Sequence, residues 1–222
     1  MSSRWPPDLP FTTVLERARH LDRDAIGQLY ERYLPTVYRF VLGRVGDVHL
    51  AEDLTAETFF AMVESADRVR AGDELGFAAW LLGIARNKTA EHFRGQAVRA
   101  AAHASFAPGI EPRAGAEADD PQRVVAARES WAEVVVALRQ LTDEQRQVVL
   151  YRCVLGYDTD AVARLMDRQP GAIRALQFRA LAALARVLSA RGTHPALAAL
   201  RATFPPVPTV TALRRSPNAP RR

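Results

Sequence analysis

The feature that most constrains the fold of this chain is residues 107–121, APGIEPRAGAEADDP. This stretch holds three prolines, two glycines and four acidic residues, against one arginine. Such a composition cannot bury enough apolar surface to offset the entropy of ordering a chain, so we expect a linker that is flexible on its own. The residues on either side are then expected to fold as two separate units.

Both flanking blocks have helical spacing. Gly and Pro are scarce between Asp22 and Arg94, and apolar residues recur there at intervals of three and four. This pattern predicts three or four helices, with breaks near Pro35, Gly43/Gly46 and Gly72/Gly76, and no alternating strand pattern competes. We predict an all-α chain. Its expected parts are an N-terminal extension (1–21), a helical domain (22–95), an acidic linker (96–122), a second helical domain (123–190) and a basic Pro/Arg-rich tail (191–222).

The charge of the chain says less about its partners than its net value of +5 suggests. Residues 189–222 hold six of the 30 basic residues and no acidic one, which leaves 24 basic and 25 acidic residues elsewhere. The body of the protein is therefore close to neutral. A nucleic-acid partner has to be argued from particular faces rather than from overall charge.

Other classes of protein are disfavoured by what the sequence lacks. The single cysteine, Cys153, excludes an internal disulfide and a multi-thiolate metal site, and we expect it to pack in the core. There is no run of 18 apolar residues and no apolar signal segment in residues 1–10, so we expect a cytoplasmic protein without membrane insertion. His49 and Asp53 stand four apart, but no second His–carboxylate pair completes a metal site, so no metal or cofactor is expected.

The second block divides into the elements of a helix-turn-helix. A first helix is followed by a short second one, a tight turn and a longer third one. Thr142 or Asp143 can cap the first helix, which Gly156 ends; Asp158 or Thr159 can cap the second, and Pro170 suits the first position of the third.

The third helix has a buried and an exposed face. At 100° per residue, Ile173, Ala180 and Leu184 align on one side, where they would face the core. An arginine can hold guanine or a phosphate, and Phe and Ala side chains can contact thymine methyls. The alternative is a solvated face with a stray phenylalanine. The residues expected on the opposite, DNA-reading side are Arg174, Ala175, Phe178 and Arg179, with Arg168 and Gln169 in the turn close to the DNA backbone.

The first block carries two further candidate surfaces. In residues 47–65, Glu52, Asp53 and Glu57 form a carboxylate patch that is either a solvated face or a docking surface for a basic partner. In residues 76–94, Trp80, Asn87 and Arg94 recur at steps of seven, with small residues between them. An aromatic ring, an amide and a guanidinium in one line can stack on an unpaired base, read its edge and hold its phosphate, which suits single-stranded DNA. The alternative for this strip is a core tryptophan with two exposed polar residues.

The two blocks together resemble a known family. LYERYLPTVYRFVLGRVGDVHLAEDLTAETFFAM, followed by FAAWLLGIARNKTAEHFR, is similar to region 2 of bacterial sigma factors, and LTDEQRQVVLYRCVLGYDTDAVARLMDRQPGAIRALQFRALAAL is similar to region 4. Their order and spacing resemble the two-domain group, the extracytoplasmic-function (ECF) sigma factors. The resemblance covers about residues 22–188.

The resemblance implies a function in transcription initiation, without an enzymatic activity. The family binds core RNA polymerase, and its members act on promoter DNA both as duplex and as single strand. Region 4 would bind the β flap and read the −35 element through the helix-turn-helix residues named above, and the acidic linker would enter the basic channel of the polymerase. Leu50, Glu52, Asp53, Leu54 and Glu57 would face the β′ clamp helices, while Arg70, Trp80, Asn87, Lys88 and Arg94 would melt and bind the −10 element.

The chain also departs from the family pattern. Housekeeping members have two adjacent aromatics where this chain has Trp80 and Leu81, which implies weaker melting and narrower promoter choice. Ala175 and Leu176 replace a frequent Ser-Arg pair, which implies fewer specific hydrogen bonds near −35. Two readings of the tail stay open, nonspecific contact with DNA or polymerase and simple disorder.

The same residues also fit a second function and a further partner. The rival function is a stand-alone helix-turn-helix regulator whose N-terminal domain senses a ligand or partner. Many members of the ECF group are held inactive by an anti-sigma factor, which makes such a protein a candidate partner.

Overall fold

The computed structural model describes residues 9–102 and 134–190, and every regular element within these ranges is helical. The first range forms α1 (Phe11–Arg19), α2 (Arg23–Val45), α3 (Val48–Glu64), the short 3-10 turn η1 (Ala66–Arg68) and α4 (Glu74–Ala102). The second starts with a helical stretch at 134–139 and continues with α6 (Asp143–Val149), the π-helical turn η2 (Leu150–Val154), α7 (Thr159–Met166) and α8 (Pro170–Ala190). The all-α prediction is confirmed.

Local capping signals set most of these helix ends. The carboxylates of Asp22, Asp47 and Asp158 each accept a hydrogen bond from the backbone N–H three residues on, which satisfies one orphan donor of α2, α3 and α7. Thr142 and Gln145 form a reciprocal capping box at the start of α6. The predicted caps of the helix-turn-helix are therefore present, and Pro170 is the first residue of α8 as expected.

The predicted break near Pro35 is wrong, because Pro35 lies inside the continuous 23-residue helix α2. Tyr33, Thr36 and Val37 around the proline are buried against neighbouring helices. Tertiary packing of these residues outweighs the one helical hydrogen bond that Pro35 cannot donate. The predicted break near Gly43/Gly46 is confirmed: the helix continues through Gly43 and ends at Gly46, whose φ of 72° is the left-handed conformation that glycine adopts without strain.

Two other boundaries differ from the expected ones. Residues 11–19, expected to be part of an extension, form α1, whose Val14, Leu15 and Ala18 are buried. Helix α4 runs on to Ala102, beyond the expected start of the linker at residue 96. The remainder of the predicted linker and the basic tail lie outside the described residues.

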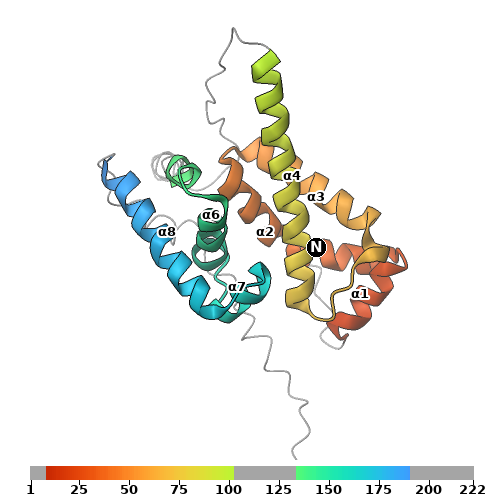
Figure 1. Ribbon diagram of the computed structural model, residues 1–222. Helices are drawn as coiled ribbons and strands as arrows, with labels where there is room; N and C mark the ends of the chain where they lie inside the picture. Colours follow the sequence, from red (N-terminus) through yellow and green to blue (C-terminus); the bar gives the residue numbers. More distant parts are fainter. Residues whose placement is uncertain (1–8, 103–133, 191–222) are drawn as a thin grey trace, which may run out of the picture.

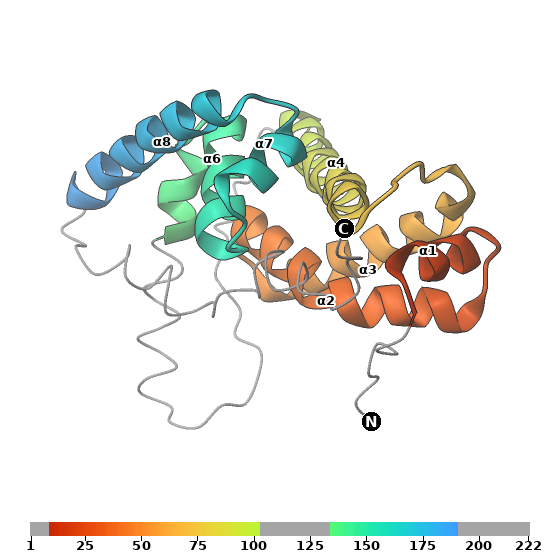
Figure 2. The same ribbon diagram turned by 90° about the horizontal axis from the view of Figure 1, so that it is seen from below.

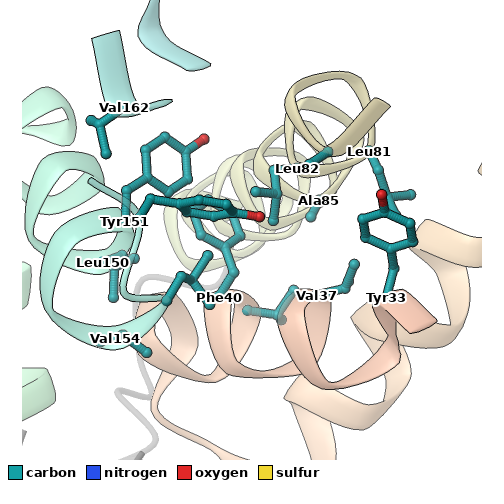
Figure 3. Packing of buried hydrophobic residues seen from close by; sticks show 14 of the residues in the cluster. Tyr33, Val37, Phe40, Leu81, Leu82, Ala85, Leu150, Tyr151, Val154 and Val162 are labelled. Carbon is teal, nitrogen blue, oxygen red and sulfur yellow. The ribbon is translucent and has the colours of Figure 1, made fainter. Parts of the chain in front are cut away.

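The two helical blocks pack against each other. α2 and α4 contact η2 and α7, and buried residues from both blocks form one hydrophobic cluster (Figures 1 and 3). Arg139 Nη2 donates to the Val45 carbonyl oxygen at 2.7 Å, and the Arg44 guanidinium, 6% exposed, pairs with Asp143. The two blocks, expected to be separate, therefore share a core in this structure.

Candidate nucleic-acid interface

Helix α8 presents the exposed face that the sequence predicts. Ile173, Ala180 and Leu184 are fully buried, so the helix is fixed in one rotation about its axis. The opposite side projects away from the rest of the molecule, and the Phe178 side chain is 75% exposed. A large apolar ring this exposed has no packing role inside the domain. The residues that the structure places together on this exposed side are Arg174, Ala175, Phe178 and Arg179.

The turn before α8 is shaped by Asp167, a non-glycine residue in the left-handed conformation with a φ of 51°. Arg168 and Gln169 follow it and are both exposed. Arg168 forms an ion pair with Glu144 of α6, so its guanidinium has a partner in this structure. Both residues line an open hollow of about 470 Å³ beside the turn. A phosphate could enter this hollow, where it would have to displace Glu144 from Arg168.

The acidic face of α3 is real, but not all of the predicted residues belong to it. Glu52, Asp53 and Glu57 are exposed, and Leu50 is half-buried. Leu54, by contrast, is 3% exposed and lies in the core. Its place in the predicted contact set is not supported by its burial, because a buried side chain acts on a partner only by holding its own helix in place.

One residue of this face was missed by sequence reasoning. Phe60 is 67% exposed on α3, three positions after Glu57 and seven after Asp53. Those spacings place its ring on the same side of the helix as the two carboxylates. The helical register of residues 48–64 contained this signal, since the adjacent Phe59 takes the core position, with 5% exposure. The face therefore combines carboxylates with an exposed aromatic ring.

Helix α4 carries the predicted aromatic, amide and guanidinium strip. Trp80 is half-buried and packs against Phe77, with ring centroids 5.6 Å apart. Asn87 and Arg94 are exposed along the same side at steps of seven. Lys88 is half-buried, and its ammonium lies 3.9 Å from the Glu91 carboxylate. Trp80 is therefore partly a core residue, and the rest of its side chain is accessible to solvent.

The accessible part of Trp80 opens into a hollow of about 590 Å³. The loop between η1 and α4 forms its other walls, through Arg70, Ala71, Gly72 and Asp73. Arg70 is exposed and lines the same hollow as Trp80. The hollow has an aromatic wall, small residues, the exposed Arg70 guanidinium and the Asp73 carboxylate; an aromatic ring beside a guanidinium can stack on one unpaired base and hold its phosphate.

The second helical block closes one side of this hollow. Arg164 of α7 lines it and forms an ion pair with Asp73. Asp73 also accepts a hydrogen bond from the Gly76 backbone N–H at 2.7 Å. The Arg164 hydrogen bond, followed by that from Gly76, holds the pKa of Asp73 below its ordinary value, although partial burial opposes the shift. Asp73 is therefore ionised and paired at neutral pH.

The candidate surfaces are not gathered into one site. The exposed face of α8 lies at one end of the molecule, whereas α3 packs on α2 and α4, away from α8 (Figures 1 and 2). Arg94 lies two turns of helix away from Asn87 and four turns from Trp80. Within residues 9–102 and 134–190, no three His, Cys, Asp or Glu side chains are grouped so as to hold a metal ion. In the same ranges, no helix has the length and apolar character needed to cross a bilayer.

Comparison with known proteins finds two family matches. Residues 29–99 match Sigma-70 region 2, and residues 131–184 match Sigma-70, region 4. These ranges contain the α3 face, the Trp80 hollow and the helix-turn-helix.

Curated relatives and solved structures agree with these matches. The ECF RNA polymerase sigma factor BldN of Streptomyces coelicolor is 37% identical over 177 residues, which are 79% of this chain and 64% of BldN. The ECF RNA polymerase sigma factor SigD of Mycobacterium tuberculosis is 30% identical over 78% of this chain and 81% of its own length. The sigma factor RpoE, solved in complex with the anti-sigma factor NepR from Bartonella quintana, shares the fold, with a TM-score of 0.53 and 22% identity over 73% of this chain and 96% of the solved one.

Proposed function

Because the chain belongs to the ECF RNA polymerase sigma factors, we propose that it binds core RNA polymerase and directs promoter recognition, DNA melting and transcription initiation. In this role it supplies specificity and carries out no chemistry of its own. Its site of action is the cytoplasm, where the polymerase works. An anti-sigma factor is a further proposed partner, of the kind that NepR is for RpoE.

The observation that carries the proposal is that two surfaces of different shape, each with side chains suited to DNA, lie on one chain. The exposed α8 face, with Arg174, Phe178 and Arg179, suits the major groove of duplex DNA near −35. The Trp80 hollow suits a single unstacked base near −10. Asn87 and Arg94, further along α4, would contact the same DNA strand. A protein that reads both paired and unpaired DNA acts where a duplex is being opened.

We assign the α3 face to the polymerase. Its carboxylates, Glu52, Asp53 and Glu57, fit a basic surface, and Phe60 adds an apolar anchor of the kind that dominates interface energetics. The expected partner is the pair of β′ clamp helices. Leu54 serves this contact indirectly, by packing α3 onto the domain.

The proposed function requires the two blocks to separate. The −10 and −35 elements lie about 25 base pairs apart, which is about 85 Å of B-form DNA at about 3.4 Å per pair. In the structure, however, Arg164 of the helix-turn-helix block lines the same hollow as Trp80. Both elements can be read at once only after α7 has left α4, and binding to polymerase would hold the two blocks at the required distance.

Run-off transcription with purified core RNA polymerase tests the proposal. We expect promoter-specific transcripts only when the protein is present, and a loss of about tenfold for Asn87→Ala and for Arg179→Ala, the size typical of a lost base contact. Arg186→Ala is the matched control, because it removes an exposed arginine about two turns further along α8, beyond the residues predicted to read DNA. A protein that footprints promoter DNA without polymerase and starts no transcripts would instead be a stand-alone regulator.

A further inference from the structure

The loop of residues 69–73, which forms one wall of the Trp80 hollow, is held in place by helix α1. Arg19, the last residue of α1, donates from Nε to the Val69 carbonyl oxygen at 3.0 Å and from Nη2 to the Ala71 carbonyl oxygen at 3.3 Å. These bonds join residues 50 and 52 positions apart in the sequence. The single guanidinium of Arg19 therefore donates to two carbonyl oxygens of the loop, one on each side of Arg70.

The guanidinium is itself held in position. Its Nη1 donates to Glu16 Oε2 at 2.7 Å, one turn earlier on α1. The Arg19 side chain is 28% exposed, so its hydrogen bonds are partly shielded from water and stronger than those of a fully exposed arginine. Helix α1 is fixed in turn by its buried Val14 and Leu15. The loop is therefore tied to a packed helix through charge-assisted bonds.

Apart from the Arg164–Asp73 ion pair, which is lost when α7 leaves α4, little else specifies the conformation of the loop. Gly72 would have no atom within 4 Å of an added Cβ, and Ala71 has only a methyl group to pack. Val69 is buried at one end and Asp73 caps α4 at the other. Between Val69 and Asp73, the hydrogen bonds from Arg19 fix the position of the backbone and, with it, the direction in which Arg70 leaves the loop.

We propose that Arg19 is a positioning residue for recognition of the −10 element: it fixes the 69–73 loop so that one unstacked base meets a preformed wall opposite Trp80. This inference rests on the proposed function, and it gives α1 a role in promoter choice although α1 does not line the hollow. A wall displaced by 1 Å would lose base discrimination while stacking on Trp80 still held the strand.

The test is run-off transcription by the full chain and core RNA polymerase on a template library randomised at both promoter elements, with the transcripts sequenced. A single mismatched base changes binding by about tenfold or more. We therefore expect Arg19→Ala to lower the base preference at one or two −10 positions by about tenfold and to leave the −35 preferences unchanged. Arg19→Lys keeps the charge but loses the planar guanidinium that donates to both carbonyls. We expect its −10 base preference to lie between those of Arg19→Ala and the wild type. Arg23→Ala, which removes an equally charged exposed side chain four residues on, is expected to behave like the wild type.

Hydrogen exchange of the free protein tests the anchor separately from transcription. In Arg19→Ala, the amides of residues 70–73 are expected to exchange faster than in the wild type and in Arg23→Ala, with the amides of α2 unchanged. An unaltered −10 preference in Arg19→Ala, or unaltered exchange in the loop, would overturn the inference. If the wild-type protein supports no promoter-specific transcription at all, the proposed function fails instead, and the exchange measurement still decides whether Arg19 holds the loop.

Discussion

The ring of Tyr151 stacks on the ring of Phe40, with centroids 5.6 Å apart and an angle of 22° between the ring planes (Figure 3). Phe40 belongs to α2 of the first helical block and Tyr151 to η2 of the second, and both are almost completely buried. Beside this pair, Leu150 covers Gly43 of α2. Burial of such aromatic and aliphatic surface favours the packed arrangement of the two blocks by several kcal/mol.

Two glycines of α2 provide a test of this packing. A Cβ added at Gly43 would clash with Leu150 Cδ2, whereas one added at Gly27 would meet no atom within 4 Å. Gly27→Ala should raise the free energy of unfolding by about 0.5–1 kcal/mol through helix propensity alone. Gly43→Ala should lower it by about 1–3 kcal/mol, because Leu150 has to move within a packed core. Urea denaturation measures both; an equal gain in the two variants would show that the blocks are not packed in solution.

The pKa of Asp73 reports on the contact between α7 and the loop. Arg164 is the largest cause of its lowered pKa, so Arg164→Ala should raise that pKa toward the ordinary value of 3.8. The pKa of Asp73 is depressed in the folded state. The ion pair therefore stabilises the packed form at a pH above the ordinary pKa, and this stabilisation is lost as the pH falls through the lowered pKa. An NMR titration of the Asp73 carboxyl group measures the shift. Arg168→Ala, which removes the guanidinium paired with Glu144, should leave the pKa of Asp73 unchanged.

The cap of α7 should be required for the helix-turn-helix. Asp158 Oδ1 accepts a hydrogen bond from the Ala161 N–H at 2.7 Å. Its replacement by alanine leaves that donor unsatisfied and should cost about 1 kcal/mol of stability. Asp158→Asn can still accept the bond and should retain most of that stability. Thermal unfolding of the two variants checks this, and equal losses would mean that the carboxylate acts through its charge.

Phe178 and Ile173 should separate DNA binding from folding on the same helix. Phe178→Ala removes a ring that is 75% exposed, so the free energy of unfolding should change by less than about 0.5 kcal/mol while transcription from the cognate promoter falls. Ile173→Ala empties a fully buried position and should cost about 2–5 kcal/mol of stability. Denaturation curves measured alongside run-off transcription distinguish the two effects. A stability loss in Phe178→Ala comparable to that of Ile173→Ala would place the ring in the core.

Substitutions on α3 should likewise separate polymerase binding from stability. Glu57→Lys reverses an exposed charge and should weaken binding to core RNA polymerase by about tenfold or more, with little change in stability. Phe60→Ala should weaken the same binding through loss of an apolar anchor. Leu54→Ala should instead destabilise the domain by about 2–5 kcal/mol. Competition with another sigma factor for core polymerase measures the affinities, and unchanged competition by Glu57→Lys would remove this face from the proposal.

Signals that act within one or two helical turns could be predicted from the sequence alone. The caps at Thr142 and Asp158, the start of α8 at Pro170 and the exposure of Phe178 each depend on neighbours three or four residues away. The similarity to sigma regions 2 and 4 added the order of the two blocks, because it depends on motifs rather than on contacts.

Tertiary structure decided what depends on residues far apart in the chain. α2 passes through Pro35 unbroken because its flanks are buried, and Leu54 is covered while Phe60, on the same helix, is left exposed. Arg19 reaches a loop 50 residues away, and Tyr151 meets Phe40 across the chain. Helical periodicity states which face of a helix is apolar. Which apolar faces meet is determined by the shapes of both partners, and a shape of this kind exists only once the chain has folded.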